Sequence, residues 1–120
     1  MKTPTNLNEL AKTVHAANVK WWQDPATGQP IKRNKGELLA LIHSEISEAL
    51  EGERKGLMDD KLPQYPMAPV EIVDAIIRQF DYAGGFKLDL GGAFVEKMLY
   101  NLSRADHKPE HRLAAGGKKW

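Results

Sequence analysis

The 120-residue sequence contains no cysteine. This absence excludes disulfide bonds, thiolate metal sites and a cysteine nucleophile. Long apolar runs are also missing, since no stretch approaches the roughly 18 consecutive apolar residues that a membrane-spanning helix needs. The N-terminal stretch MKTPTNLNEL lacks the apolar region of a secretory signal peptide. We therefore expect a cytoplasmic protein with no membrane partner.

A strong excess of charge of one sign is absent as well. The 17 basic and 16 acidic residues give a formal net charge of +1. This near-neutrality argues against nucleic acid or an anionic membrane as an obligatory partner. Hydrophobic residues make up 42% of the chain and charged residues 28%, which is typical of a globular protein. The length predicts a single domain over residues 1–120.

Convincing strand patterns are scarce, and helical periodicity dominates the sequence. Apolar spacing predicts four helices, separated by loops with proline and glycine, at about 7–22, 36–54, 69–84 and 91–106. The predicted class is all-α with a four-helix-bundle-like architecture, which a helical hairpin with extra helices could equally reach by dimerising. We expect oligomerisation to complete the bundle. The helical core covers about 6–106, and the polar tail over 107–120 is expected to be irregular or loosely docked.

Carboxylates interrupt the apolar face of the second predicted helix. At about 100° per residue, Glu45 falls inside the apolar arc, between Leu41 and Ile42, and Glu48 lies on its rim. Glu51 points away and is expected to be solvated. A carboxylate among buried leucines is costly unless it is paired, protonated or bound to a metal. The pattern therefore predicts a partner for Glu45.

The third predicted helix carries a contiguous charged strip beside its apolar face: Glu71, Asp74, Arg78 and Asp81. Glu71 and Asp74 form a second pair of carboxylates at a spacing of three residues. If the two helices pack together, four carboxylates meet, and they repel unless protons or a cation neutralise them. Oxygen ligands select hard cations, so we expect Mg²⁺, with Mn²⁺ as the alternative ion. Salt bridges to Arg54, Lys55 or Arg78 are the structural alternative.

The fourth predicted helix places Lys97, Asn101 and Arg104 in one row. Two cations and an amide suit a phosphate chain, because arginine can bind phosphate through two hydrogen bonds and lysine acts as a point charge. A solvated basic face is the other interpretation of this row.

Together these residues resemble a known family. Glu45-x-x-Glu48, then 22 residues, then Glu71-x-x-Asp74 resembles the magnesium-binding signature of the all-α nucleoside triphosphate pyrophosphohydrolases, the MazG-like superfamily. Lys97-x-x-x-Asn101-x-x-Arg104 is similar to the stretch that this family uses on substrate phosphates. The segment RNKGELLALIHSEISEALEGERKG also looks like the entry into the metal-binding helix of small, single-domain members. The resemblance covers about residues 6–105.

The resemblance implies hydrolysis of a (deoxy)nucleoside triphosphate between the α and β phosphates, which gives the monophosphate and pyrophosphate. By the same resemblance, the four carboxylates would hold magnesium, and Lys97, Asn101 and Arg104 would hold phosphates. Family members are usually dimers or tetramers whose active sites combine several helices, so a homodimer or homotetramer is implied. Candidate substrates include dUTP, dCTP, a damaged nucleotide and phosphoribosyl-ATP.

One departure from the family concerns the catalytic base. Many members carry a further glutamate at the position that Ser44 occupies here. Glu48 or a water ionised by the metal would then have to act as the base. Asp81 is not expected to bind the metal directly but to orient Arg78 or a metal-bound water through a hydrogen bond.

Nucleobase recognition is expected near the first helix and the loop that follows it. Trp21 and Trp22 are candidates for stacking, and Asn34 for hydrogen bonding. Packing in the core or at an interface is the alternative for at least one tryptophan. His15 and His43 are assigned to a helix surface or an interface, not to a metal.

Three rival classes were weighed. A di-iron carboxylate bundle uses Glu-x-x-His pairs, and no glutamate here has a histidine three positions later. A helix-turn-helix DNA-binding protein conflicts with the near-zero net charge. A non-enzymatic helical dimer with salt-bridged charged strips, acting as an interaction or regulatory module, is the main alternative.

Overall fold

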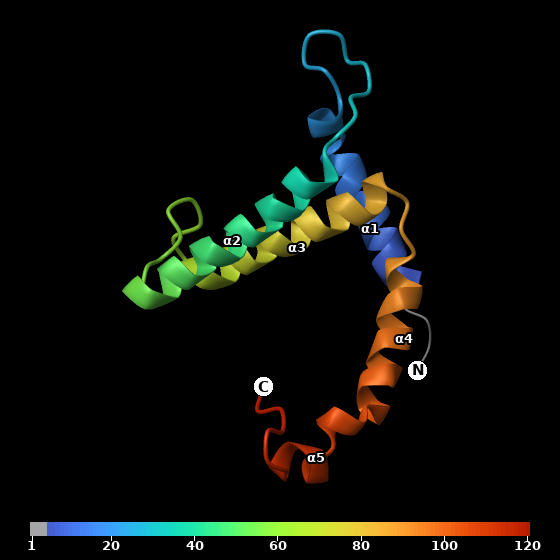
Figure 1. Ribbon diagram of the computed structural model, residues 1–120. Coiled ribbons are helices and arrows are strands. Elements are labelled where there is room, and N and C mark those ends of the chain that lie inside the picture. The colour runs from blue at the N-terminus through green and yellow to red at the C-terminus, as the bar shows by residue number, and fades with distance from the viewer. Residues whose placement is uncertain (1–4) are drawn as a thin grey trace.

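The computed structural model describes residues 5–120, and its regular structure is entirely helical. In chain order the elements are α1 (Thr5–Ala17), the 3₁₀ turn η1 (Val19–Trp22), α2 (Lys35–Lys55), α3 (Met67–Gly85), α4 (Leu90–Ser103), the 3₁₀ turn η2 (Ala105–His107) and α5 (Pro109–Leu113) (Figure 1). Extended pairing in this part of the chain is limited to two isolated bridges. The all-α prediction is thereby confirmed for residues 5–120. No helix among them is long and apolar enough to cross a membrane.

The predicted end of the first helix, at about residue 22, is wrong. The α-helix ends at Ala17, because the Asn18 side chain donates to the carbonyl of Val14 and the Asn18 backbone leaves the helical region. The chain then continues as the tighter turn η1. The third helix begins at Met67, earlier than predicted, with Pro69 in its first turn, where no intrahelical amide bond is lost.

The C-terminal tail is more ordered than the sequence predicted. Residues Pro109–Leu113 form the short helix α5, which has proline at its start. Arg112 of α5 donates to the carbonyls of Lys118 and Lys119, so the end of the chain folds back on this helix.

Helix α3 lies between α2 and α1 and packs along both (Figure 1). Small residues allow the close approach. A Cβ at Gly52 of α2 would lie 2.8 Å from the Cβ of Met67, and one at Gly84 of α3 would lie 2.5 Å from the carbonyl oxygen of Ala11. The polar strip of α3 is half-buried beside its two neighbours as a result.

The apolar faces of the hairpin formed by α2 and α3 are only partly covered. The buried apolar residues of the described chain are few, and none is larger than leucine: Ala11, Leu38, Ala49, Ala75, Ala83 and Val95. Large side chains of both helices are about half exposed, among them Leu39, Ile46, Leu50, Ile72, Val73 and Ile76. One chain therefore leaves unburied much of the surface that its periodicity marks as apolar.

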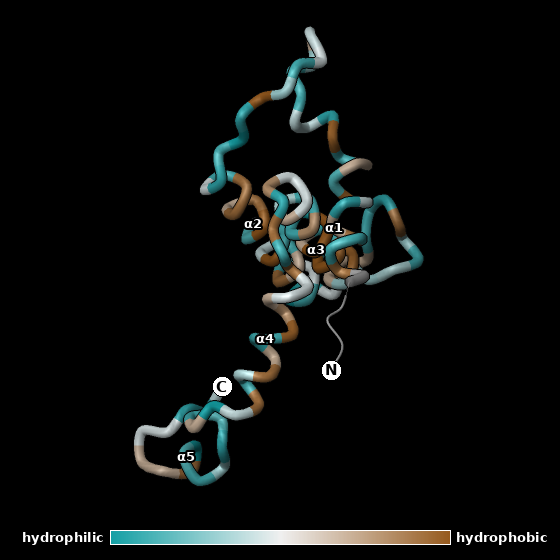
Figure 2. Tube along the Cα trace, turned by 90° about the vertical axis from the view of Figure 1, so that its right-hand side faces the viewer, coloured by the Kyte–Doolittle hydropathy of each residue, from teal (hydrophilic) through white to brown (hydrophobic). Residues whose placement is uncertain are grey.

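Helix α4 leaves the group formed by α1, α2 and α3. Its N-terminus is fixed to α1, because Asn8 accepts from the Gly91 amide and donates to Asp89, the residue that caps α4. From there α4 and α5 extend as an arm, and Figure 2 shows apolar residues along α4. The Cα radius of gyration is 18.3 Å, against about 14 Å for a compact domain of this length.

Candidate metal centre

Three carboxylates from two helices converge between α2 and α3. Glu45 of α2 and Glu71 and Asp74 of α3 each offer an oxygen, and these oxygens lie within 4.8 Å of one another. The convergence follows from helical spacing, because residues three apart on α3 share the face that meets α2. The sequence prediction that these two pairs of carboxylates share one place is confirmed for these three residues.

Glu45 is buried, as its helical phase predicted, with 8% of its surface exposed. Its charge is compensated by Arg78 of α3, whose Nε donates to Glu45 Oε1 at 2.8 Å. This ion pair provides the partner that the buried carboxylate requires. It is also one of the salt bridges that the structural alternative predicted, whereas Lys55 pairs with Glu51, outside the carboxylate cluster.

The cluster retains protons when no cation is bound. Burial, hydrogen bonds with Glu45 and Glu48, and the charges of Glu48 and Asp74 raise the pKa of Glu71 to about 8. Burial and the charge of Glu45 also raise the pKa of Asp74, although the charge of Arg78 opposes this shift. Glu48 is not among the three carboxylates whose oxygens converge, and its effect on the cluster is the raised pKa of Glu71.

Asp59 is a fifth carboxylate that the sequence analysis missed. It lies in the loop between α2 and α3, is 6% exposed, and accepts from the amides of Lys61 and Leu62 at 3.0 and 2.7 Å. Its charge contributes to the raised pKa of Asp74. The segment Asp-Asp-Lys-Leu-Pro could have indicated an Asx turn, but not its position beside the cluster.

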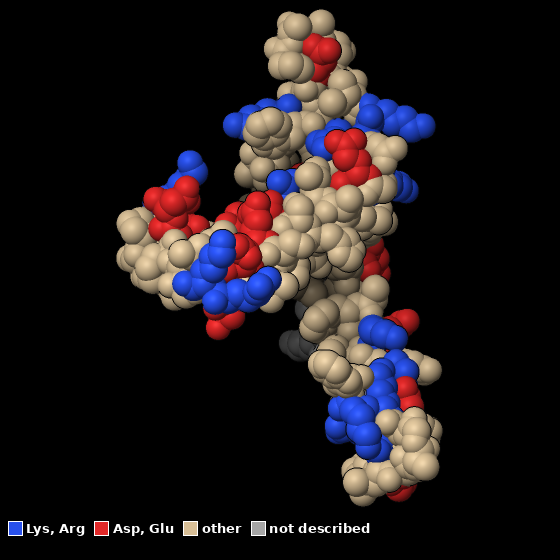
Figure 3. Space-filling view, turned by 60° about the vertical axis from the view of Figure 1, so that its left-hand side comes forward, with Lys and Arg blue, Asp and Glu red and all other residues tan. Residues whose placement is uncertain are grey.

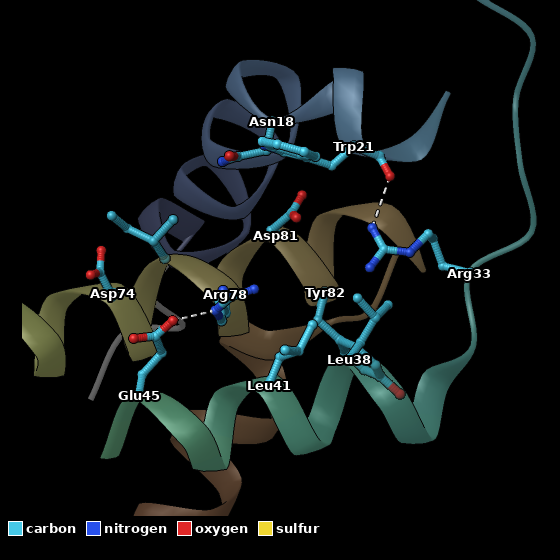
Figure 4. A pocket seen from close by; sticks show the side chains of 11 residues that line it. Asn18, Trp21, Arg33, Leu38, Leu41, Glu45, Asp74, Arg78, Asp81 and Tyr82 are labelled. Atoms are coloured by element: carbon cyan, nitrogen blue, oxygen red, sulfur yellow. Dashed lines mark hydrogen bonds and ion pairs between the residues drawn. The ribbon is translucent and has the colours of Figure 1, made fainter. Parts of the chain in front are cut away.

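A cavity of about 470 Å³ opens from the carboxylates towards the end of α1 (Figure 4). Its lining residues come from the junction of α1 and η1, from η1, α2 and α3, and from the loop before α2: Asn18, Trp21, Arg33, Leu38, Leu41, Glu45, Asp74, Ile77, Arg78, Asp81 and Tyr82. Glu45 and Asp74 lie at one end, and Trp21 and Arg33 at the other. The cavity therefore joins an acidic end to an aromatic end.

Trp21 lines this cavity, whereas Trp22 and Asn34 are not among its lining residues. Trp21 is 61% exposed, and its carbonyl accepts from Arg33. The Trp22 indole donates to both carboxylate oxygens of Asp81 at 3.1 Å and packs edge-on against Phe86. Asn34 caps α2 by accepting from the Glu37 amide.

Asp81 accepts hydrogen bonds from aromatic residues of α1 and η1. Within residues 5–120 it makes no hydrogen bond to Arg78. Besides Trp22, it binds His15, whose Nδ1 lies 2.8 Å from its carboxylate. His15 also stands edge-on to Trp22. His15 therefore lies where α1 meets α3, and Asp81 fixes η1 onto α3.

The predicted phosphate-binding row lies on the arm, away from the carboxylates of the same chain (Figure 1). Arg104 is paired with Asp106 through bonds of 2.9 and 2.6 Å, and Lys97 lies over the ring of Tyr100. The buried Oδ1 of Asn101 lacks a hydrogen-bond partner in the part of the chain that the structure describes. A single chain does not bring this row to the carboxylate cluster.

The donor set at the cluster consists of carboxylate oxygens, which fits a hard divalent cation such as Mg²⁺ or Mn²⁺.

A scan of the chain against protein-family models, a search of curated proteins and a search of solved structures each find no match.

Proposed function

We propose that the protein hydrolyses a (deoxy)nucleoside triphosphate between its α and β phosphates and releases the monophosphate and pyrophosphate. The observation that carries this proposal is the cavity itself, which runs from the acidic cluster to an exposed tryptophan. Its volume is in the range of small-molecule sites. A nucleotide is a ligand with matching ends: phosphates that need a cation and a base that stacks on an aromatic ring.

The residues that would hold the cation are Glu45, Glu71 and Asp74, with Glu48 beside Glu71. Bound there, Mg²⁺ supplies charge neutralisation of the phosphate oxygens and lowers the pKa of a coordinated water. Glu48 is the proposed base, because its carboxylate acts on Glu71 and could orient the attacking water and accept its proton. Asp59 fixes the neighbouring loop and adds negative charge to the cluster.

Trp21 is the proposed platform for the base, in place of Trp22 and Asn34. Its side chain is exposed and lines the cavity, whereas Trp22 is occupied with Asp81 and Phe86. The hydrogen bond from Arg33 to the Trp21 carbonyl, and the anchoring of Trp22 on α3, hold this platform at the cavity end.

The site would be completed by a second copy of the chain, in a homodimer or homotetramer. Half-exposed leucines, isoleucines and valines on α2 and α3 support such an assembly, as does the extended arm. The arm of one chain would then bring Lys97, Asn101 and Arg104 to the phosphates bound by its partner.

A non-enzymatic helical dimer is the second candidate, and the pairs Arg78–Glu45 and Lys55–Glu51 are the observation that favours it. In that case the charged strips are satisfied by salt bridges alone. Melting with and without Mg²⁺ separates the two candidates, because only a ligand that binds the native state raises the Tm.

The test of the proposed reaction uses a panel of canonical and modified nucleoside triphosphates with Mg²⁺, and quantifies monophosphate and pyrophosphate. We expect Glu48→Gln and Asp74→Asn to lose at least about 100-fold in activity while keeping the wild-type helical content. Glu51→Gln is the matched control, because Glu51 lies on the same helix but pairs with Lys55. Wild-type activity in either cluster variant would contradict the assignment.

A further inference from the structure

Two cations line the cavity, and they differ in how their guanidinium groups are used. Arg33 lies at the aromatic end, where its Nη1 donates to the Trp21 carbonyl and its guanidinium stands over the ring of Trp22. Arg78 lies on α3 one turn after Asp74, at the boundary between the acidic end and the rest of the cavity (Figure 4). Arg33 therefore supports the aromatic end, and Arg78 is the cation next to the carboxylates.

Arg78 uses only part of its guanidinium within the described chain. The hydrogen bond that the structure records is from Nε to Glu45 Oε1, at 2.8 Å. A guanidinium has five N–H donors in a fixed plane, so the four donors on the terminal nitrogens stay available. The Arg78 side chain is 41% exposed, which leaves these donors accessible from the cavity.

The charges around Arg78 favour an anion at this point. In the cation-free protein, Arg78 compensates Glu45 and lowers the pKa of Asp74 against the effect of burial. A divalent cation at the cluster would take over that compensation and place further positive charge beside the guanidinium. An anion that touches both charges would then be stabilised most strongly.

We propose that Arg78 links Glu45 to the substrate: Nε keeps its bond to the carboxylate while the terminal nitrogens bind a phosphate oxygen. This inference rests on the proposed function and adds a phosphate contact from the same chain as the carboxylates, independent of the arm. The planar fork of arginine suits the task, because it can serve two acceptors at once. A lysine at this position has one ammonium group and could not hold both partners in the same geometry.

The test compares the wild-type full-length chain with Arg78→Lys by calorimetric titration, first with Mg²⁺ alone and then with inorganic pyrophosphate in saturating Mg²⁺. We expect Arg78→Lys to retain Mg²⁺ binding and to lose at least about tenfold in pyrophosphate affinity, because a charged hydrogen-bonded contact is removed. Arg54→Lys is the matched control, since Arg54 is exposed at the end of α2, and it should bind both ligands as the wild type does.

Equal pyrophosphate affinity in wild type and Arg78→Lys would overturn this inference while leaving the proposed function standing. A wild-type protein that does not bind Mg²⁺ would overturn the proposed function first. A second measurement uses only the wild-type protein, so that the test still works if Arg78→Lys does not fold. It records ¹⁵N NMR spectra of the arginine side chains. Pyrophosphate should shift the terminal-nitrogen signals of Arg78 when Mg²⁺ is present, and unchanged signals would contradict the contact.

Discussion

At the scale of single residues, Glu71 controls the charge of the cluster. Its pKa of about 8 lies above the ordinary value of 4.5, since burial and the neighbouring carboxylates disfavour the ionised form. Around neutral pH the metal-free protein therefore keeps this carboxyl protonated. A cation has to displace that proton, so cation binding and proton release are coupled at this position.

The coupling predicts how stability depends on pH. A carboxyl whose pKa is raised by folding stabilises the native state fully below its unfolded pKa of 4.5, and this contribution is lost as the pH rises to about 8. We therefore expect the Tm of the metal-free protein to fall over this interval, and the rise in Tm produced by Mg²⁺ to grow with pH. Thermal melts at several pH values, with EDTA or Mg²⁺, measure both trends.

The matched variant for this prediction is Glu71→Gln, which imitates the protonated side chain. It should flatten the metal-free pH dependence and reduce the Mg²⁺ response, whereas Glu51→Gln should leave both unchanged. A wild-type Tm with the same pH dependence as that of Glu71→Gln would show that Glu71 is not the responsible group.

Residue positions could be predicted from the sequence where helical phase decides them. Glu45 was placed inside an apolar arc by counting residues, and the structure buries it. Asp59 could not be placed in this way, because its position depends on how a loop folds back over α3. Trp21 and Trp22 were not separable either, since a 3₁₀ turn replaces the expected α-helix and changes the direction of both side chains.

At the scale of the elements, two glycines near the end of α3 determine how α1 and η1 dock. The sequence used Gly84 and Gly85 to end the third helix, and α3 does end at Gly85. Their main structural effect is space: Gly84 admits the backbone of α1, and Gly85 faces the Trp22 ring. Two residues beyond the end of α3, Lys87 adopts a left-handed conformation with φ of 55°.

This contact predicts the effect of adding one methyl group. In Gly85→Ala the new Cβ would overlap the Trp22 ring, and that ring cannot move freely because Asp81 holds its indole nitrogen. We expect a loss of about 1–3 kcal/mol in the free energy of unfolding, measured by denaturant titration. Gly36→Ala is the control, because its Cβ would meet only the Asn34 side chain, at 3.3 Å. An unchanged unfolding free energy in Gly85→Ala would refute the tight packing of Trp22.

The extent of most helices could also be predicted, because caps and breakers are local signals. Helix α2 was predicted at 36–54 and spans Lys35–Lys55, with Gly56 as a left-handed C-cap, whereas the capping role of Asn34 was not predicted. The direction of α4 was not predictable, since it is set by the bonds of Asn8 to Asp89 and Gly91, which join residues distant in sequence.

At the scale of the whole molecule, the chain is elongated and leaves much apolar surface exposed. Its principal extents are 59 × 37 × 26 Å, and its apolar helix faces are half exposed. The end of the arm, residues 104–120, carries five lysines and arginines against two acidic residues. Figure 3 shows several basic side chains on this arm, with acidic ones among them, and both acidic and basic groups on the body of the molecule. Apolar area and complementary charge both favour a second copy of the chain as the partner.

The proposed dimer leads to a prediction about activity, which a measurement of the oligomer's molecular mass would not test. If the arm of one chain serves the carboxylates of another, Glu48→Gln and Arg104→Ala are each inactive alone but complement each other in a mixed dimer, because one of its two sites is intact. After unfolding and refolding together, an equal mixture should recover about a quarter of wild-type activity, as random pairing of two chains requires.

A mixture of Glu48→Gln with Asp74→Asn is the control. Both changes then lie in the carboxylate cluster, which each chain forms by itself. No pairing of these two variants contains an intact cluster, so activity should not return. Recovery in the control, or none in the first mixture despite dimers in light scattering, would refute the exchange of arms.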